Sequence, residues 1–514
     1  MASPAQHFPN RPQFSDFMKP CRFEGEVQNL EVHGDLPNDI DGTFYRVMPD
    51  PQLPPFIDDD PWFNGDGNVS AFRIKDGSVT FQQKYVRTEK FVREREARRA
   101  LIGTDFLTYV ASIFQFRYII ERANHFQPGK YRNKFTDAVE FTVRSTANTN
   151  VVSFNGQLLA LKEDSPPYAM DPETLETKGL YTFDGQLPSV TFTAHPKTDP
   201  VTGELVCFGY EAKGDGSPDI CYYTIGSDGK FTQTVWLASP VCGMIHDFAV
   251  TENWVLFPVI PQLCDLERLK QGGEHWQWSP ETPFYIGVIP RYGAKPSDVK
   301  WFTYKNSFPG HTANAYEQDD GKIVFDLGLS DKNVFYWWPD AQGNSPKPSK
   351  IHSQLTRFTV DPNAEEGHLP EPEVLHDGNS EFYRIDDRFS GRKYSHSYFD
   401  LMDPGLGTDF AAIAPVMGGG YPPYNSLAHH DESTGNTEVY FPGRTHLVQE
   451  PVFIPRAGST EEGDGYLMAL VNNYRTLSSE LHLLDCRDFT KARAIIMLPL
   501  RLRAGLHGNW VNNN

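Results

Sequence analysis

The chain has 514 residues, 39% of them hydrophobic and 22% charged, so its composition is that of a globular protein with a large core and excludes intrinsic disorder. Its formal net charge of −20 argues against nucleic acid as a partner and against an anionic membrane surface as an electrostatic target. No apolar run reaches the about 18 residues of a transmembrane helix, and the N-terminus lacks a hydrophobic signal region, so we expect a cytoplasmic protein; no protein partner is implied.

Two contrasting segments follow one another in the first third of the chain. Residues 88–102 (TEKFVREREARRALI) pair charges four positions apart, which predicts an exposed helix. Residues 104–128 are rich in Phe, Tyr and Ile and have little periodicity. Three interpretations of them stay open: a buried capping segment, an exposed apolar patch, or an insertion absent from relatives. We assign no function to this segment.

Short strands dominate the rest of the chain. Residues 150–161 (NVVSFNGQLLAL) and 244–260 each predict a β-hairpin, and residues 464–473 predict a further strand. Residues 264–273 end in a glycine signal typical of a short helix. Many short strands with regular turns indicate a sandwich, a barrel or a propeller. At about 40–45 residues per blade, seven blades with long insertions would fill the chain, although no WD or kelch repeat is present.

The six cysteines are widely and irregularly spaced, without a Cys-x-x-Cys pair. They are Cys21, Cys207, Cys221, Cys242, Cys264 and Cys486. In so large a chain this spacing predicts reduced core thiols rather than a disulfide framework or a zinc site.

Four of the sixteen histidines share one setting: each lies at or near the end of a strand-like run, beside a small residue. They are His195 (VTFTAHPK), His246 (GMIHDFAV), His311 (FPGHTANAYE) and His507 (GLHGNW). Small neighbours allow backbones to crowd an axis on which several imidazoles converge, and imidazole suits iron, copper and zinc. Gaps of 51, 65 and 196 residues exclude one local motif and fit one ligand from each of several strands.

Other sites find less support in the sequence. There is no HExxH, GxGxxG, P-loop or GxSxG motif, so the sequence does not support a zinc peptidase, a nucleotide-binding protein or a serine hydrolase. His396 (KYSHSYF) is the best competing histidine. His429 and His430 are adjacent and should point to opposite faces of a strand; we interpret both as surface residues.

Around the four histidines the sequence resembles the carotenoid cleavage oxygenase family. The four histidine segments match the ligand segments of that family in order, and residues 61–72 (PWFNGDGNVSAF) are similar to its early Gly-Asp-Gly segment. The resemblance covers nearly the whole chain. It implies an all-β fold, a seven-bladed β-propeller that holds iron(II) on its axis under a cap of loops and helices, with residues 1–514 forming a single domain.

The resemblance also implies three glutamates that orient three of the histidines. By local match these are Glu163, Glu381 and Glu450. A carboxylate that accepts the second N–H of an imidazole fixes its tautomer and strengthens its basicity. The alternative for each is a solvated surface charge.

Within the family, the similarity is greatest to fungal and bacterial enzymes that cleave lignostilbene or resveratrol. Those recognise a para-phenol through a tyrosine and a lysine, and the matching positions are Tyr131 and Lys162. The resemblance therefore implies a non-haem Fe(II) dioxygenase that uses O2 to cleave the interphenyl C=C bond of 4-hydroxystilbenes (resveratrol, piceatannol or lignostilbene) into two aromatic aldehydes. Two alternatives stay open: an apocarotenoid or carotenoid cleaver, which would need a longer apolar tunnel and no Lys162, and a non-catalytic propeller that serves as a binding scaffold.

Overall fold

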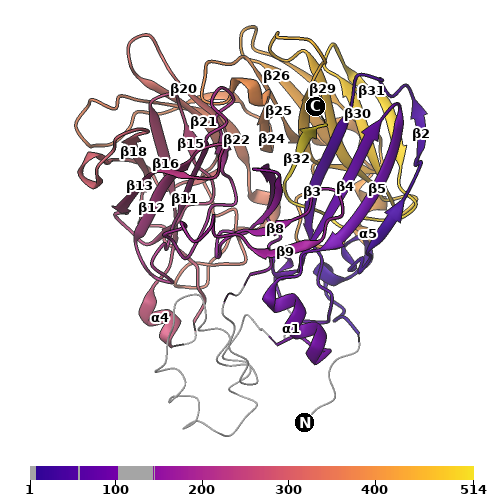
Figure 1. Ribbon diagram of the computed structural model, residues 1–514, viewed down its shortest axis with the longest axis horizontal. Helices are drawn as coiled ribbons and strands as arrows, with labels where there is room; N and C mark the ends of the chain where they lie inside the picture. Colours follow the sequence, from indigo (N-terminus) through magenta and orange to yellow (C-terminus); the bar gives the residue numbers. More distant parts are fainter. Residues whose placement is uncertain are drawn as a thin grey trace, which may run out of the picture.

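The computed structural model describes residues 7–55, 58, 60–101, 143, 145–271 and 273–513. The strands of this part form seven antiparallel sheets that fan around a common centre, a seven-bladed β-propeller (Figure 1). The fold class predicted from the sequence is therefore confirmed. The possible insertion at 104–128 lies outside the described residues.

Five blades are built from consecutive strands. The first contains β6 (Asn150–Phe154), β7 (Gln157–Leu161), β8 (Tyr168–Met170) and β9 (Thr177–Leu180), and the second contains β10 (Lys197–Thr198), β11 (Leu205–Gly209), β12 (Asp219–Ile225) and β13 (Phe231–Ala238). The third contains β14 (Gly243–Met244), β15 (Ala249–Val250), β16 (Trp254–Leu263), β17 (Gln277–Trp278), β18 (Phe284–Pro290) and β19 (Lys300–Tyr304). The fourth contains β20 (Phe308–Glu317), β21 (Ile323–Ser330), β22 (Ser353–Val360) and β23 (Glu373–His376), and the fifth contains β24 (Asn379–Ile385), β25 (His396–Met402), β26 (Ser426–Asp431) and β27 (Asn436–Tyr440).

The other two blades combine strands from both ends of the chain. One contains β1 (Gly25–Val27), β3 (Gly42–Pro49), β4 (Gly67–Lys75), β5 (Ser78–Tyr85) and β32 (Gly508–Asn512); the other contains β2 (Glu31–Gly34), β28 (His446–Pro455), β29 (Gly465–Asn473), β30 (Ser478–Asp485) and β31 (Asp488–Met497). The last strand pairs with β3 and the early strand β2 pairs with β31, so each end of the chain completes a sheet made by the other end. In Figure 1 the indigo β3, β4 and β5 accordingly lie beside the yellow β30 and β31.

The core lies between neighbouring blades, because both faces of these sheets carry apolar side chains. All eight residues of β3 are buried. Phe72 of β4 belongs to the same cluster as Met468 of β29 and Leu481 of β30, which joins the two blades of mixed origin. The innermost strands β20, β24, β28, β32 and β6 contact one another in that order and surround the centre.

Helices are few in the described part of the chain. They are α1 (Glu89–Ala97), α4 (Leu266–Lys270) and α5 (Phe410–Met417), together with short 3-10 turns at Pro12–Phe14, Asp16–Met18, Trp62–Asn64, Pro296–Asp298, Pro348–Lys350, Asp387–Phe389 and Pro404–Leu406. No helix among the described residues is long and apolar enough to cross a membrane.

Most local elements lie where the sequence predicts them. The hairpin β6–β7 turns at Asn155 and Gly156, both with positive φ, as a tight hairpin turn requires. Helix α1 begins after Thr88, whose side chain accepts from the Phe91 N–H. It is shorter than 88–102 because Arg98 adopts a left-handed conformation. Its exposure was overestimated, since Phe91 packs into the interior.

The interpretation of His429 and His430 as surface residues is wrong. Both lie in β26 and point to opposite faces, but a neighbouring blade covers each face: His429 lies against Phe489 of β31, and His430 lies against His376 of β23. His430 is buried and contacts Thr437 of β27, and the His429 ring stacks on Tyr398 of β25. Neither joins the histidines at the centre.

Candidate metal centre

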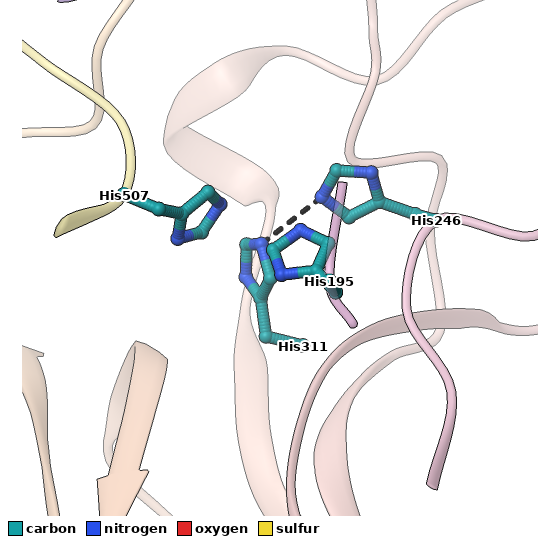
Figure 2. A group of neighbouring side chains, drawn as sticks. All are labelled: His195, His246, His311 and His507. Carbon is teal, nitrogen blue, oxygen red and sulfur yellow. Dashed lines mark hydrogen bonds between the residues drawn. The ribbon is translucent and has the colours of Figure 1, made fainter. Parts of the chain in front are cut away.

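The four histidines singled out in the sequence converge at the centre of the propeller (Figure 2). His195 precedes β10, His246 follows β14, His311 lies within β20 and His507 immediately precedes β32. One ring nitrogen from each lies within 4.8 Å of the others. The competing candidate His396 lies in β25 and contacts His429 instead.

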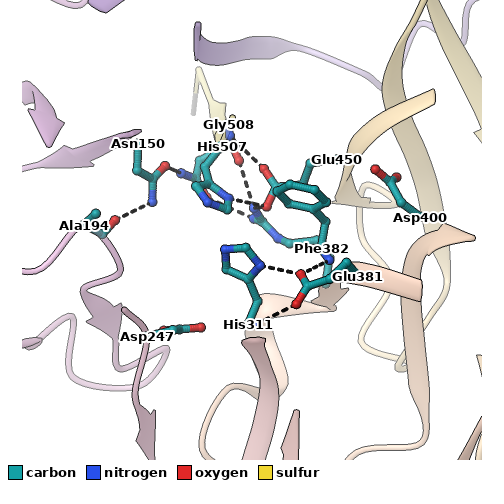
Figure 3. Close-up of polar contacts among 12 residues, drawn as sticks. Asn150, Ala194, Asp247, His311, Glu381, Phe382, Asp400, Glu450, His507 and Gly508 are labelled. Carbon is teal, nitrogen blue, oxygen red and sulfur yellow. Dashed lines mark hydrogen bonds and ion pairs between the residues drawn. The ribbon is translucent and has the colours of Figure 1, made fainter. Parts of the chain in front are cut away.

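The three glutamates that the resemblance implies lie against three of these imidazoles, and Figure 3 shows the pairs Glu381–His311 and Glu450–His507. Glu163 contacts His246 Nδ1, and Glu381 contacts His311 Nδ1. Glu450 Oε1 lies 2.8 Å from His507 Nδ1. Each carboxylate therefore pairs with a ring at the centre of the propeller: the His507 ring is buried, and those of His246 and His311 are only 17% and 14% exposed.

Irregularities in the inner strands aim these groups at the axis. The register of β20 shifts at His311, that of β24 shifts just after Glu381, and that of β28 shifts at Glu450. A β-bulge bends its strand and redirects a side chain. Gly310 precedes His311 because the Glu381 carboxylate occupies the space that a Cβ would take. The small neighbours seen in the sequence thus have a steric cause.

The arrangement of ring nitrogens fits a bound cation. A carboxylate only accepts hydrogen bonds, so Nδ1 of His246 and of His311 each donates to its glutamate, and both Nε2 atoms carry lone pairs. These two Nε2 atoms lie 3.0 Å apart, so their lone pairs face one another at a separation that a shared metal ion would make favourable. His195 Nε2 is buried and has no hydrogen-bond partner among the described residues. Four nitrogen lone pairs are therefore available to one metal ion.

Burial and local charge set the protonation states that metal binding needs. Burial, followed by the neighbouring His507, lowers the pKa of His195 well below its usual range, so its imidazole is neutral. Burial tends to raise the pKa of Glu163, Glu381 and Glu450, but the imidazole against each one lowers that pKa below the ordinary value. The carboxylates are therefore ionised and accept the Nδ1 protons.

Two aromatic rings, Phe382 and Phe335, lie against this group. Phe382, one residue after Glu381, stacks on His311 with ring centroids 5.0 Å apart. Phe335, in the loop between β21 and β22, lies 6.4 Å from the His246 ring, and its own ring contacts Phe63. The sequence did not predict this aromatic wall, formed by Phe335 in a loop and Phe382 in β24, because neither residue differs locally from an ordinary core phenylalanine. It is suited to a flat, apolar substrate.

A buried ion pair fixes the segments that carry three of the histidines. Asp247, directly after His246, lies 2.7 Å from Lys197 Nζ, two residues after His195. The same carboxylate accepts the backbone N–H of Thr312, the residue after His311. One aspartate therefore holds three ligand segments in register, a role that sequence reasoning missed although Asp247 adjoins a predicted ligand.

The predicted phenol-binding pair can be placed only in part. Lys162 follows β7, directly before Glu163, and its Nζ lies 3.4 Å from both the Phe63 carbonyl and Asn148 Oδ1. It therefore adjoins the aromatic wall and the carboxylate that contacts His246. Tyr131 lies outside the described residues.

Comparison with known proteins decides the family. The model of the retinal pigment epithelial membrane protein family matches residues 18–512. The chain belongs to this family, the carotenoid cleavage oxygenases. The resemblance inferred from the sequence is thus confirmed, and members of the family are oxygenases that depend on a metal.

Three carotenoid cleavage oxygenases illustrate the similarity. Resveratrol cleavage oxygenase 1 of Aspergillus fumigatus is 70% identical, over 100% of this chain and 98% of its own length. Carotenoid cleavage oxygenase 1 of Neurospora crassa is 56% identical, over 99% and 92%. The crystal structure of Pseudomonas brassicacearum lignostilbene dioxygenase superposes with a TM-score of 0.90 at 42% identity, covering 99% of this chain and 100% of that one.

We expect Glu450→Gln to weaken metal retention and turnover by about 10–100-fold without unfolding the protein. Glutamine offers one acceptor oxygen, whereas Glu450 accepts both from His507 Nδ1 and from the Gly508 N–H. Metal content after dialysis against a weak chelator, together with turnover, measures the effect. Glu480→Gln is the matched control, because Glu480 makes an equivalent buried pair with His482 in β30. If both variants lost metal and turnover equally, the effect of Glu450→Gln would come from a general loss of stability and not from the contact with His507.

Proposed function

We propose that this chain is a non-haem Fe(II) dioxygenase that cleaves the interphenyl C=C bond of 4-hydroxystilbenes and releases two aromatic aldehydes. The observation that carries the proposal is the convergence of four imidazoles, three of them oriented by glutamates, in a chain 70% identical to a resveratrol cleavage oxygenase. Resveratrol and lignostilbenes share a para-phenol conjugated to the central alkene, so this group is the feature that the site should recognise.

In this proposal His195, His246, His311 and His507 hold iron(II). Iron bound there would supply the one-electron chemistry that reaction with dioxygen requires and that zinc lacks. Glu163, Glu381 and Glu450 keep Nδ1 of three rings protonated, so that each Nε2 presents its lone pair. The rings of Phe335 and Phe382 exclude water from one side of the site and offer flat surfaces to the substrate.

Lys162 and Tyr131 are proposed to bind the 4-hydroxyl group of the stilbene. A phenol has a pKa of about 10, so at neutral pH it is mostly protonated. The Lys162 ammonium would favour the phenolate, which conjugates through the ring to the alkene and raises its electron density. Activation would thus arise from the charge on Lys162.

Lys162→Ala should lower kcat by about 100-fold while changing substrate KM much less, because the charge develops mainly along the reaction path. Steady-state kinetics with resveratrol measures both. Iron content is a necessary control, because Glu163 next to Lys162 contacts His246. Lys178→Ala, in the outer strand β9, is the matched control. Full activity of Lys162→Ala would rule out phenolate activation.

Product analysis with resveratrol, a lignostilbene and a β-apocarotenal offered in parallel tests the function. We expect two aldehydes from each 4-hydroxystilbene and no cleavage of 4-methoxy analogues. The similarity to the Neurospora carotenoid cleavage oxygenase makes apocarotenoid cleavage the rival result. Rapid turnover of the apocarotenal, or of 4-methoxystilbenes at the same rate as 4-hydroxystilbenes, would favour that rival. No turnover of any compound by iron-loaded protein would favour a binding scaffold.

A further inference from the structure

A second group of metal-binding side chains lies apart from the four histidines. Ligand atoms of Glu211, Cys242 and Cys264 lie within 4.8 Å of one another, and Glu211 forms a similar trio with Asp215 and His275. Glu211 follows β11, the two cysteines lie before β14 and after β16, and His275 lies between α4 and β17. Segments far apart in sequence therefore bring two sulfurs, an imidazole and carboxylates together.

The backbone holds the two cysteines side by side. The Cys264 N–H donates to the Cys242 carbonyl at 2.9 Å, where β14 and β16 pair. The Cys264 thiol lies within 4.8 Å of the Cys242 thiol and of a Glu211 oxygen. Glu211 belongs to both trios and is thus the centre of the cluster.

Glu211 is held in place toward these groups. One of its oxygens lies 2.8 Å from His275 Nε2, and the other lies 3.8 Å from Cys242 Sγ. Its φ of 47° is in the left-handed region, which is uncommon for a residue with a side chain and marks positions that the surrounding structure enforces. The residue is buried, with 7% of its surface exposed. A buried carboxylate aimed at two thiols and an imidazole is what a metal ion would need.

We propose that Cys242, Cys264, His275 and Glu211 form a second, structural metal site that binds zinc. Two sulfurs and one carboxylate oxygen supply three of the four donors that Zn²⁺ takes in tetrahedral sites, and His275, whose Nε2 lies 2.8 Å from the same carboxylate, would supply the fourth. Thiolates select zinc, whereas the histidine centre offers nitrogen donors only. The two sites would therefore sort two metals by the softness of their ligands.

This inference revises the interpretation of the cysteines made from the sequence. Cys242 and Cys264 are 22 residues apart, and their partners come from other segments, so no zinc motif is visible along the chain. All six cysteines are free thiols, and the other four have no part in the cluster. A disulfide between Cys242 and Cys264 is the competing outcome, in which Glu211 would keep only His275 and the Gly216 N–H as partners.

The second site is connected to the histidine centre by the chain itself. Tyr210, directly before Glu211, donates its hydroxyl to Glu163 Oε2 at 2.9 Å, and Glu163 in turn contacts His246. Cys242 lies four residues before His246. A metal held by Glu211 and Cys242 would therefore fix both segments that position His246.

Elemental analysis of the full-length protein, produced with iron and zinc both supplied, tests the proposal. We expect about one zinc per chain, retained through dialysis against a weak chelator. Cys264→Ala and His275→Ala should lose the zinc and keep most of the iron, and His311→Ala should do the reverse. Cys21→Ser is the matched control, because Cys21 is a half-buried thiol that is distant from the cluster in the sequence, and this variant should keep both metals. This pattern separates failure of the zinc site from failure of the proposed dioxygenase.

A second readout does not depend on the variants. Cobalt(II) substituted at the site should give the intense near-ultraviolet charge-transfer absorption of cobalt–thiolate bonds, which imidazole ligands cannot produce. Thiol counting in denaturant, with and without reductant, detects a disulfide. The proposal would be overturned if protein from zinc-supplied cells contained no zinc, or if the cobalt-substituted protein lacked that absorption. It would also be overturned if two of the thiols could be counted only after reduction.

Discussion

His311→Ala should lose iron and turnover together, with a loss of activity well beyond the about 10–100-fold expected for removal of a carboxylate partner. The ring supplies one of four nitrogens that converge at the axis, and its Nε2 lies 3.0 Å from that of His246. Without it, three neutral donors stay behind and the site opens to water. The fold should survive, because Glu381 keeps the backbone N–H groups of residues 311 and 382 as partners.

Iron content by elemental analysis, turnover of resveratrol and thermal unfolding measure these effects. His396→Ala is the matched control, since His396 is paired with another histidine, His429, at 3.1 Å in a different blade. It should keep iron and activity. The same loss in both variants would point to general destabilisation, and a His311→Ala protein with full iron and full turnover would end the four-histidine assignment.

Deletion of residues 505–514 should abolish soluble expression as well as iron binding. The deletion removes His507 and also β32, which pairs with Gly42–Arg46 of β3 and contacts β28 and β6. Its loss exposes one edge of β3 at the core of the molecule. Since domains are stable by only about 5–15 kcal/mol, loss of an inner strand should leave little folded protein.

Two controls separate the loss of the strand from the loss of the ligand. Deletion of residues 513–514 alone keeps β32 and should be nearly neutral. His507→Ala in the full chain should fold, with an unfolding temperature close to that of the parent, but should bind no iron. Soluble, iron-loaded protein from the 505–514 deletion would show that the fourth ligand lies elsewhere.

The sequence predicts the histidine centre better than its surroundings, and the reason is physical. At Gly310 and Gly508 the backbone lies so close to Glu381 and to Tyr45 that no side chain would fit. The sequence therefore has a glycine beside His311 and another beside His507, and both can be recognised without the structure. The order of the four histidine segments then identifies the family. Phe335 and Asp247 carry no such mark, because an aromatic residue in a loop and a buried acid look ordinary until the fold brings them to the site.

Local sequence patterns also could not predict which side chains are exposed to solvent. His429 and His430 alternate as a strand requires, but their burial depends on the neighbouring blades, where Phe489 of β31 lies against His429 and His376 of β23 lies against His430. The cluster around Glu211 was missed for the same reason. Its two trios share Glu211 and take their other members from residues 215–275, which the sequence gives no reason to associate.

The exchange of strands between the two ends of the chain also governs when the enzyme can mature. During synthesis the N-terminal blades emerge first and can begin to fold. Their inner edge at β3 nevertheless waits for β32, and His507 reaches the centre only with that strand. The proposed iron centre therefore lacks a ligand until β32 has been synthesised and has paired with β3. Iron would then be acquired only after that pairing, and a chain without β32 could not activate oxygen.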